Sequence, residues 1–195
     1  MPCDVTNPAS VTKFRDQVLE TCGGVDILAY AAGYTFRRPT AEISEADWNS
    51  LLDTDLTGAV RCAQAFYPAL KASGRGRLIH IASLGSYLGF QEVTAYCAAK
   101  TALLSLTRSL AVEWARDRIS VNAIAPGIFP TELNSHLISG TPRGQEMMMR
   151  TPMARFGRAE ELVGTAVLLA SDASSYLTGQ CIAVDGGYLA SGVNQ

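Results

Sequence analysis

Short apolar stretches rich in β-branched residues alternate along the chain with longer segments of helical periodicity. The short stretches have the length and composition of strands and comprise residues 25–30, 77–82, 119–124 and 180–184. The longer segments carry apolar residues at helical spacing and comprise residues 46–72, 95–117 and 159–171. Such alternation is typical of βαβ units, so the sequence predicts an α/β fold with a parallel sheet and helices on both faces.

Glycines mark the ends of the predicted strands. Gly33, Gly85, Gly127 and Gly186 each follow a strand closely, at the carboxyl edge where open α/β sheets bind their ligands. The segment 130–152 comes after the third strand and combines glycine and proline with three consecutive methionines. We interpret this segment as either a substrate lid or a pair of surface helices.

Tyr96 and Lys100 stand four positions apart at the start of a predicted helix, so their side chains share one face. An ammonium beside a phenol lowers the pKa of the phenol and suits it to acid–base catalysis. Ser83 ends the preceding strand, which allows its hydroxyl to hold a substrate oxygen while Tyr96 moves the proton. The alternatives are an exposed helix pair and an ordinary turn serine.

Ser83, 13 positions before Tyr96, and the Tyr96-x-x-x-Lys100 motif together resemble the signature of the classical short-chain dehydrogenase/reductase family. The resemblance extends from residue 4 to residue 187 and implies a Rossmann-like, doubly wound parallel sheet. It also implies an oxidoreductase that transfers hydride between the nicotinamide of NAD or NADP and a carbonyl or secondary alcohol carbon. In this assignment Ser83 holds the substrate oxygen, Tyr96 is the acid or base, and Lys100 holds the ribose and tunes Tyr96.

The same resemblance assigns cofactor-binding roles from the adenine end to the nicotinamide carboxamide. The residues concerned are Asp4, Ala32, Gly33, Tyr96, Lys100, Gly127, Phe129 and Thr131. The sequence departs from the family where Tyr30 and Ala31 replace two asparagines and where Asp55 replaces the catalytic asparagine. We expect Asp55 to hold the water of the proton relay, and its charge to oppose the lowering of the Tyr96 pKa.

Two segments that contain arginine bear on the substrate. Arg37-Arg38-Pro39 and Ala154-Arg155-Phe156-Gly157 resemble the subgroup that includes gluconate 5-dehydrogenases, and arginine suits a carboxylate substrate. Solvated arginines, a 3-oxoacyl-carrier-protein reductase, a broad carbonyl reductase and a non-catalytic scaffold of the same fold remain alternatives. The sequence disfavours a serine hydrolase, because it has no G-x-S-x-G elbow, and a metal site, because His80 lies inside an apolar strand.

The front of a dinucleotide-binding domain is not recognisable in this sequence. The resemblance identifies the start of the chain with the third strand of the family, and no glycine-rich turn follows a first strand. That turn holds the pyrophosphate on backbone N–H groups and precedes the residue that selects NAD or NADP. We therefore expect residues 1–195 to form a single, N-terminally truncated domain without its first two βα units. Such a chain should bind cofactor weakly and expose residues 25–30 as a strand edge.

The composition indicates the cellular compartment of the protein and the kinds of partner that it binds. The 195 residues are 48% hydrophobic and 17% charged with a formal net charge of −2, which disfavours nucleic-acid binding. The five cysteines form no CxxC motif, and no apolar run approaches the roughly 20 residues that span a bilayer. We expect a cytoplasmic protein that binds a small-molecule substrate and no membrane. It should form a homodimer or homotetramer through its two long helical segments.

Overall fold

The structure is a computed structural model that describes residues 1–131 and 134–192. The described residues form a parallel sheet of four strands in the order β1-β2-β3-β4. The strands are β1 (Ile27–Tyr30), β2 (Gly76–Ile81), β3 (Ile119–Pro126) and β4 (Cys181–Val184). Each lies within two residues of its predicted bounds, so the predicted α/β fold with a parallel sheet is confirmed.

Parallel pairing brings the carboxyl ends of the strands to one edge of the sheet. Tyr30 is opposite His80, and Pro126 is opposite Val184, so the loops that follow β1, β2 and β3 leave the sheet side by side. At the end of the strand order, β1 pairs with β2 alone among the described strands, and Ile27 is 45% exposed. The predicted apolar edge is therefore present.

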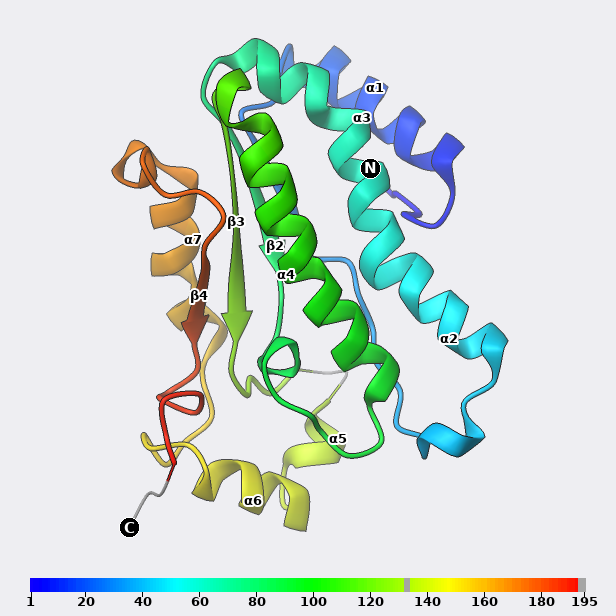
Figure 1. Ribbon diagram of the computed structural model, residues 1–195, viewed down its shortest axis with the longest axis vertical. Coiled ribbons are helices and arrows are strands. Elements are labelled where there is room, and N and C mark those ends of the chain that lie inside the picture. Colours follow the sequence, from blue (N-terminus) through cyan, green and yellow to red (C-terminus); the bar gives the residue numbers. More distant parts are fainter. Residues whose placement is uncertain (132–133, 193–195) are drawn as a thin grey trace.

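Helices cover both faces of this sheet (Figure 1). Helices α3 and α4 lie on one face, α7 lies on the other, and α1 packs against α3. The helices are α1 (Pro8–Cys22), α2 (Glu45–Leu52), α3 (Gly58–Ser73), α4 (Thr94–Trp114), α5 (Ser135–Ile138), α6 (Pro142–Met149) and α7 (Val163–Ala170). None of the described helices combines the length and the apolarity that a membrane span requires.

Two helical features differ from the prediction. The apolar pattern does not predict α1, although Asn7 caps its first turn through hydrogen bonds from Ala9 N and Ser10 N and Gly23 ends it with a positive φ of 73°. The predicted helix over 46–72 is interrupted by a π-helical turn at Asp53–Thr57 that separates α2 from α3.

The core occupies both sides of the sheet because neighbouring strand residues point to opposite faces. On the side of α3 and α4, Leu78 packs with Phe66 and Leu70. On the other side, Ile79 packs with Leu169 of α7. Burial on both faces explains why β2 and β3 are nearly continuous apolar runs in the sequence.

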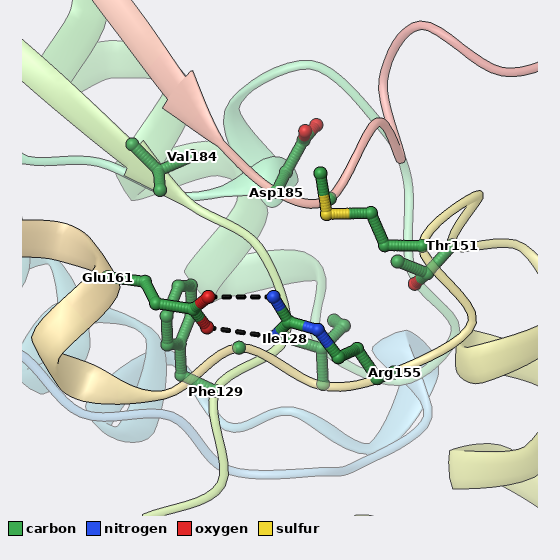
Figure 2. A pocket seen from close by; sticks show the side chains of 10 residues that line it. Ile128, Phe129, Thr151, Arg155, Glu161, Val184 and Asp185 are labelled. Atoms are coloured by element: carbon green, nitrogen blue, oxygen red, sulfur yellow. Dashed lines mark hydrogen bonds and ion pairs between the residues drawn. The ribbon is translucent and has the colours of Figure 1, made fainter.

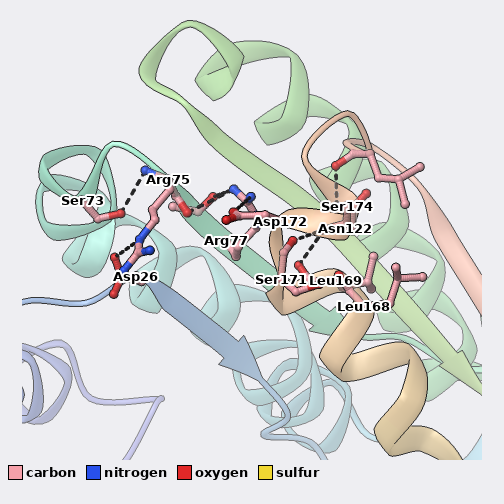
Figure 3. A network of polar contacts seen from close by, with 12 residues as sticks. Asp26, Ser73, Arg75, Arg77, Asn122, Leu168, Leu169, Ser171, Asp172 and Ser174 are labelled. Atoms are coloured by element: carbon pink, nitrogen blue, oxygen red, sulfur yellow. Dashed lines mark hydrogen bonds and ion pairs between the residues drawn. The ribbon is translucent and has the colours of Figure 1, made fainter.

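A network of polar contacts surrounds the start of β2 (Figure 3). The Arg77 side chain is 8% exposed and lies 3.4 Å from the Asp172 carboxylate that follows α7. Arg75 pairs with Asp26 in front of β1 at 3.2 Å. Ser174 donates to the Leu169 carbonyl at 3.2 Å. These contacts fix the ends of α7, β1 and β2, away from the carboxyl edge.

The segment 130–152 contains α5 and α6, which lie beyond the carboxyl ends of the strands (Figure 1). This arrangement agrees with the helix-pair interpretation. The two helices touch through Gly144, because a Cβ there would lie 1.7 Å from the Ile138 carbonyl oxygen. Glycine at this position therefore permits α6 to pack against α5.

Candidate active site

A cavity of about 540 Å³ lies at the carboxyl edge of the sheet. Its walls come from the loops after β1, β2 and β3, from the start of α4, and from α5 and α6. Of the predicted site residues, those that line it are Gly33, Ser83, Tyr96, Lys100, Gly127, Phe129 and Thr131. Residues far apart in sequence thus converge on one cavity.

Ser83, Tyr96 and Lys100 meet at this cavity as predicted. Ser83 directly follows the end of β2, and its Oγ accepts a hydrogen bond from Gly85 N at 3.1 Å. The same hydroxyl lowers the pKa of Tyr96 through a side-chain interaction. Because α4 begins at Thr94, Tyr96 and Lys100 lie one turn apart on one face, with Lys100 Nζ 5.6 Å from the centroid of the Tyr96 ring.

Lys100 forms a buried ion pair with Asp55. Its Nζ donates to the Ile81 carbonyl at 3.1 Å and lies 3.3 Å from Asp55 Oδ2. Asp55 is fully buried, and its Oδ1 accepts from Tyr34 N at 3.0 Å. Burial raises the pKa of Asp55 and lowers the pKa of Lys100, while the opposite charge of each partner counters both shifts.

The π-helical turn at Asp53–Thr57 carries Asp55 into this position. The buried Tyr30 contacts this turn, because its hydroxyl donates to the Thr54 carbonyl at 2.5 Å. Tyr30, which stands where the family signature has asparagine, therefore links β1 to the turn that holds Asp55.

The pKa of Tyr96 is raised, which corrects the prediction that this pKa is lowered. Burial is the largest cause, and the Asp55 charge adds to it, whereas the hydrogen bond from Ser83 opposes it. Burial therefore outweighs the stabilisation of the phenolate that the sequence predicts from Lys100, and a carboxylate 3.3 Å from that ammonium weakens the stabilisation. The expected opposing effect of Asp55 is confirmed in direction.

Known proteins are similar to this chain in sequence and in fold. Residues 1–189 match the family described as enoyl-(acyl carrier protein) reductase. The chain is 36% identical over 184 residues to gluconate 5-dehydrogenase of Gluconobacter oxydans (strain 621H), which covers 94% of this chain and 72% of the relative. It is also 36% identical over 188 residues to 5-keto-D-gluconate 5-reductase of Escherichia coli (strain K12). This match covers 96% of this chain and 74% of the relative.

A solved structure agrees with both sequence matches. The crystal structure of a gluconate 5-dehydrogenase from Burkholderia cenocepacia J2315, in complex with NADP and tartrate, superposes with a TM-score of 0.93 at 36% identity. The match covers 97% of this chain and 74% of that one. The chain belongs to the short-chain dehydrogenase/reductase family. Members of this family are NAD(P)-dependent oxidoreductases, and this chain is of that class.

Two residues that the family resemblance assigns to the cofactor lie away from the cavity. Asp4 is exposed, and its Oδ1 accepts from Thr6 N at 2.9 Å and from Thr6 Oγ1 at 2.7 Å in the turn before α1. Ala32 packs against the core beside Tyr30 and is absent from the cavity lining. In this structure both residues support the loops at the ends of α1 and β1.

The arginines after β1 that the sequence associates with substrate are both ion-paired with carboxylates of the protein. Arg37 is ion-paired with Glu92, and Arg38 is ion-paired with Asp47. Neither is simply solvated, and neither is free to bind a carboxylate without breaking a pair. The pairing also ties the loop after β1 to the loop before α4, since Arg38 N donates to the Glu92 carbonyl at 2.8 Å.

Arg155 lines a separate cavity of about 180 Å³ (Figure 2). Its guanidinium forms two hydrogen bonds with the Glu161 carboxylate, at 2.8 and 2.7 Å. In the same cavity a Cβ on Gly157 would lie 2.4 Å from the Phe129 ring. The segment 154–157 therefore supports Phe129, which lines both cavities, and is absent from the lining of the larger one.

His80 is a buried residue of β2 and does not line the cavity. Its ring is fully buried, and its Nδ1 lies 2.8 Å from Thr107 Oγ1. Burial lowers the pKa of His80 to about 4. No group of three or more potential metal-ligating side chains occurs among the described residues.

Sequence reasoning missed several residues of the cavity wall. Tyr34, Phe90 and Met147 contribute apolar surface, and Arg143 contributes a charge. Met147 and Arg143 lie one turn apart on α6 and are on one face of that helix. That spacing was visible in the sequence, but nothing in the sequence placed the face against the cavity.

Proposed function

We propose that the protein is an NAD(P)-dependent dehydrogenase or reductase of a sugar acid. The observation that carries the proposal is the convergence of Ser83, Tyr96 and Lys100 in one cavity whose described lining contains cationic side chains and no carboxylate. Such a lining favours a substrate that carries a carboxylate. The named activities of the gluconate dehydrogenase relatives support the same substrate class.

The cavity fits the nicotinamide half of the cofactor. Lys100 has three N–H donors; one donates to the Ile81 carbonyl, and the ammonium forms an ion pair with Asp55 at 3.3 Å. A remaining donor is proposed to bind a ribose hydroxyl. Gly33 gives the space this requires, because a Cβ there would lie 3.1 Å from Lys100 Nζ. Gly127, which also lines the cavity, is proposed to contact the carboxamide together with Phe129 and Thr131.

The proposed reaction needs one proton transfer from the protein. When bound, the cofactor accepts or supplies a hydride at C4 of its nicotinamide. In oxidation, the Tyr96 phenolate takes the proton of the substrate hydroxyl, and in reduction the phenol returns it to the carbonyl oxygen. Ser83 donates a hydrogen bond to that oxygen. Lys100 favours the phenolate, and Asp55 positions Lys100.

A 3-oxoacyl-carrier-protein reductase or a broad carbonyl reductase is the second candidate. Apolar side chains in the cavity wall, including Phe36, Phe90 and Ile138, favour it, as does the description of the matching family. Turnover of gluconate and 5-ketogluconate should be compared with turnover of acetoacetyl thioesters at saturating NAD and NADP. Preference for the sugar acids supports the first proposal, and preference for the thioesters overturns it.

We also propose that copies of the chain associate through α3 and α4. Support comes from Val112 of α4, which is 82% exposed. Light scattering should then give at least the mass of a dimer, and a monomer at all concentrations would contradict the proposal.

The cysteines of the chain are free thiols, which supports a reducing compartment such as the cytoplasm.

A further inference from the structure

The cations of the cavity wall are not equivalent. The lining contains Arg37, Lys100 and Arg143. Arg37 is ion-paired with Glu92, and Lys100 lies 3.3 Å from Asp55. Each of these two charges is thus already balanced by a carboxylate of the protein, and a substrate carboxylate would have to compete with that partner.

Arg143 has no such partner among the described residues. Its NH1 donates to the Gln91 carbonyl at 3.4 Å, which is long for an N–H···O bond. A neutral carbonyl leaves the positive charge unbalanced. A carboxylate can replace this weak contact with two short, charge-assisted bonds in the planar geometry of a guanidinium.

The position of Arg143 is fixed by the packing of α6. Thr141 Oγ1 accepts from Gly144 N at 3.0 Å at the start of the helix. Gly144 sits against the Ile138 carbonyl of α5. Arg143 and Met147 therefore present one face of α6 to the cavity, and α6 is a different element from those that carry Ser83 and Tyr96.

We propose that Arg143 is the residue that binds the substrate carboxylate and selects sugar acids over neutral polyols. The inference rests on the proposed function and names the side chain that confers its specificity. The carboxylate lies against α6, and the carbon that exchanges hydride lies at Ser83 and Tyr96. The volume of about 540 Å³ lies in the range of small-molecule sites.

The test compares gluconate with glucitol, in which a hydroxymethyl group replaces the carboxylate. Dissociation constants for both are measured by calorimetry on the full chain, with and without NADP, for the wild type and for Arg143→Gln. Arg143→Gln should weaken gluconate binding by roughly tenfold or more, the loss expected for hydrogen bonds to a charged group. Glucitol binding should change by less than about twofold.

Two further variants control for charge and geometry. Arg150→Gln removes the same charge at the end of α6, where Arg150 lies 5.7 Å from the Tyr188 ring and outside the cavity lining. It should leave both constants unchanged. Arg143→Lys keeps the charge but not the paired donors, and it should recover only part of the gluconate affinity.

Each outcome separates the inference from the function on which it rests. If the wild type prefers gluconate and Arg143→Gln leaves that preference intact, Arg143 is not the carboxylate site. If Arg143→Gln weakens gluconate and glucitol equally, the residue only supports the cavity wall and the inference is wrong. If the wild type binds glucitol as tightly as gluconate and turns over thioesters instead, the proposed substrate class fails and the inference fails with it.

Discussion

Asp55→Asn removes a negative charge from the buried pair that holds Lys100 and keeps nearly the same side-chain shape. Because the Asp55 charge raises the pKa of Tyr96, the substitution should lower that pKa. The asparagine can still accept the hydrogen bond that Tyr34 N now donates to Asp55. The change therefore acts on the electrostatics of the site more than on its geometry.

The size of the effect follows from two distances. Lys100 Nζ lies 3.3 Å from Asp55 Oδ2 and 5.6 Å from the centroid of the Tyr96 ring, which places the carboxylate within about 9 Å of the phenol. At an effective dielectric constant of about 20, two unit charges at this distance interact by about 2 kcal/mol. The pKa of Tyr96 should therefore fall by about one unit.

The assay is the pH dependence of kcat for alcohol oxidation at saturating cofactor. Oxidation needs the Tyr96 phenolate, so activity rises with pH through the pKa of Tyr96. In Asp55→Asn this rising limb should move to lower pH by about one unit. The matched control is Asp53→Asn, which removes a carboxylate of the same turn that is paired with Arg61 at 2.6 Å.

Asp53→Asn should leave the rising limb of the pH dependence of kcat in place. If Asp55→Asn retains a native circular dichroism spectrum and its rising limb stays in place or moves to higher pH, the Asp55 charge does not raise the pKa of Tyr96.

Burial lowers the pKa of His80 to about 4, so the folded state binds fewer protons than the unfolded state between that value and about 6.5. The free energy of unfolding should fall by up to about 3 kcal/mol as pH drops through this interval, and urea unfolding of His80→Leu should show a flatter decline. Gly144→Ala places a Cβ against the Ile138 carbonyl, so steady-state kinetics should show a higher KM for substrate while NADP titration shows unchanged affinity. Arg155→Gln breaks the two bonds to Glu161, and it should lower the Tm in a thermal melt and leave the KM for gluconate unchanged; a raised KM would return Arg155 to the substrate site.

The strands were predictable from the sequence because parallel strands buried on both faces are continuous apolar runs. Leu78 and Ile79 are adjacent, yet each packs into a different core. Helix α1 was harder to predict because Val11 is its only fully buried described residue, so its apolar stripe is narrow. Its end signals, Asn7 with Pro8 and then Gly23, were present in the sequence.

In the active site, too, the sequence predicted the contacts between residues close together in the chain and missed those between distant segments. The spacing of Ser83, Tyr96 and Lys100 is local, so the sequence alone brings them together once a strand and a helix are assigned. The pairing of Arg37 with Glu92 joins two loops that are 55 positions apart, and no periodicity predicts it. The same holds for Asp55, whose contact with Lys100 depends on a π-helical turn supported by Tyr30.

Tyr96→Phe removes the hydroxyl that is proposed to transfer the proton in this cavity. Single-turnover oxidation of gluconate should be followed at saturating NAD or NADP, with cofactor affinity measured separately by fluorescence titration. Tyr96→Phe should lower the rate by at least about a hundredfold and leave the cofactor dissociation constant within about twofold of the wild type. Turnover at the wild-type rate in Tyr96→Phe, with cofactor bound equally well, would show that Tyr96 does not transfer the proton.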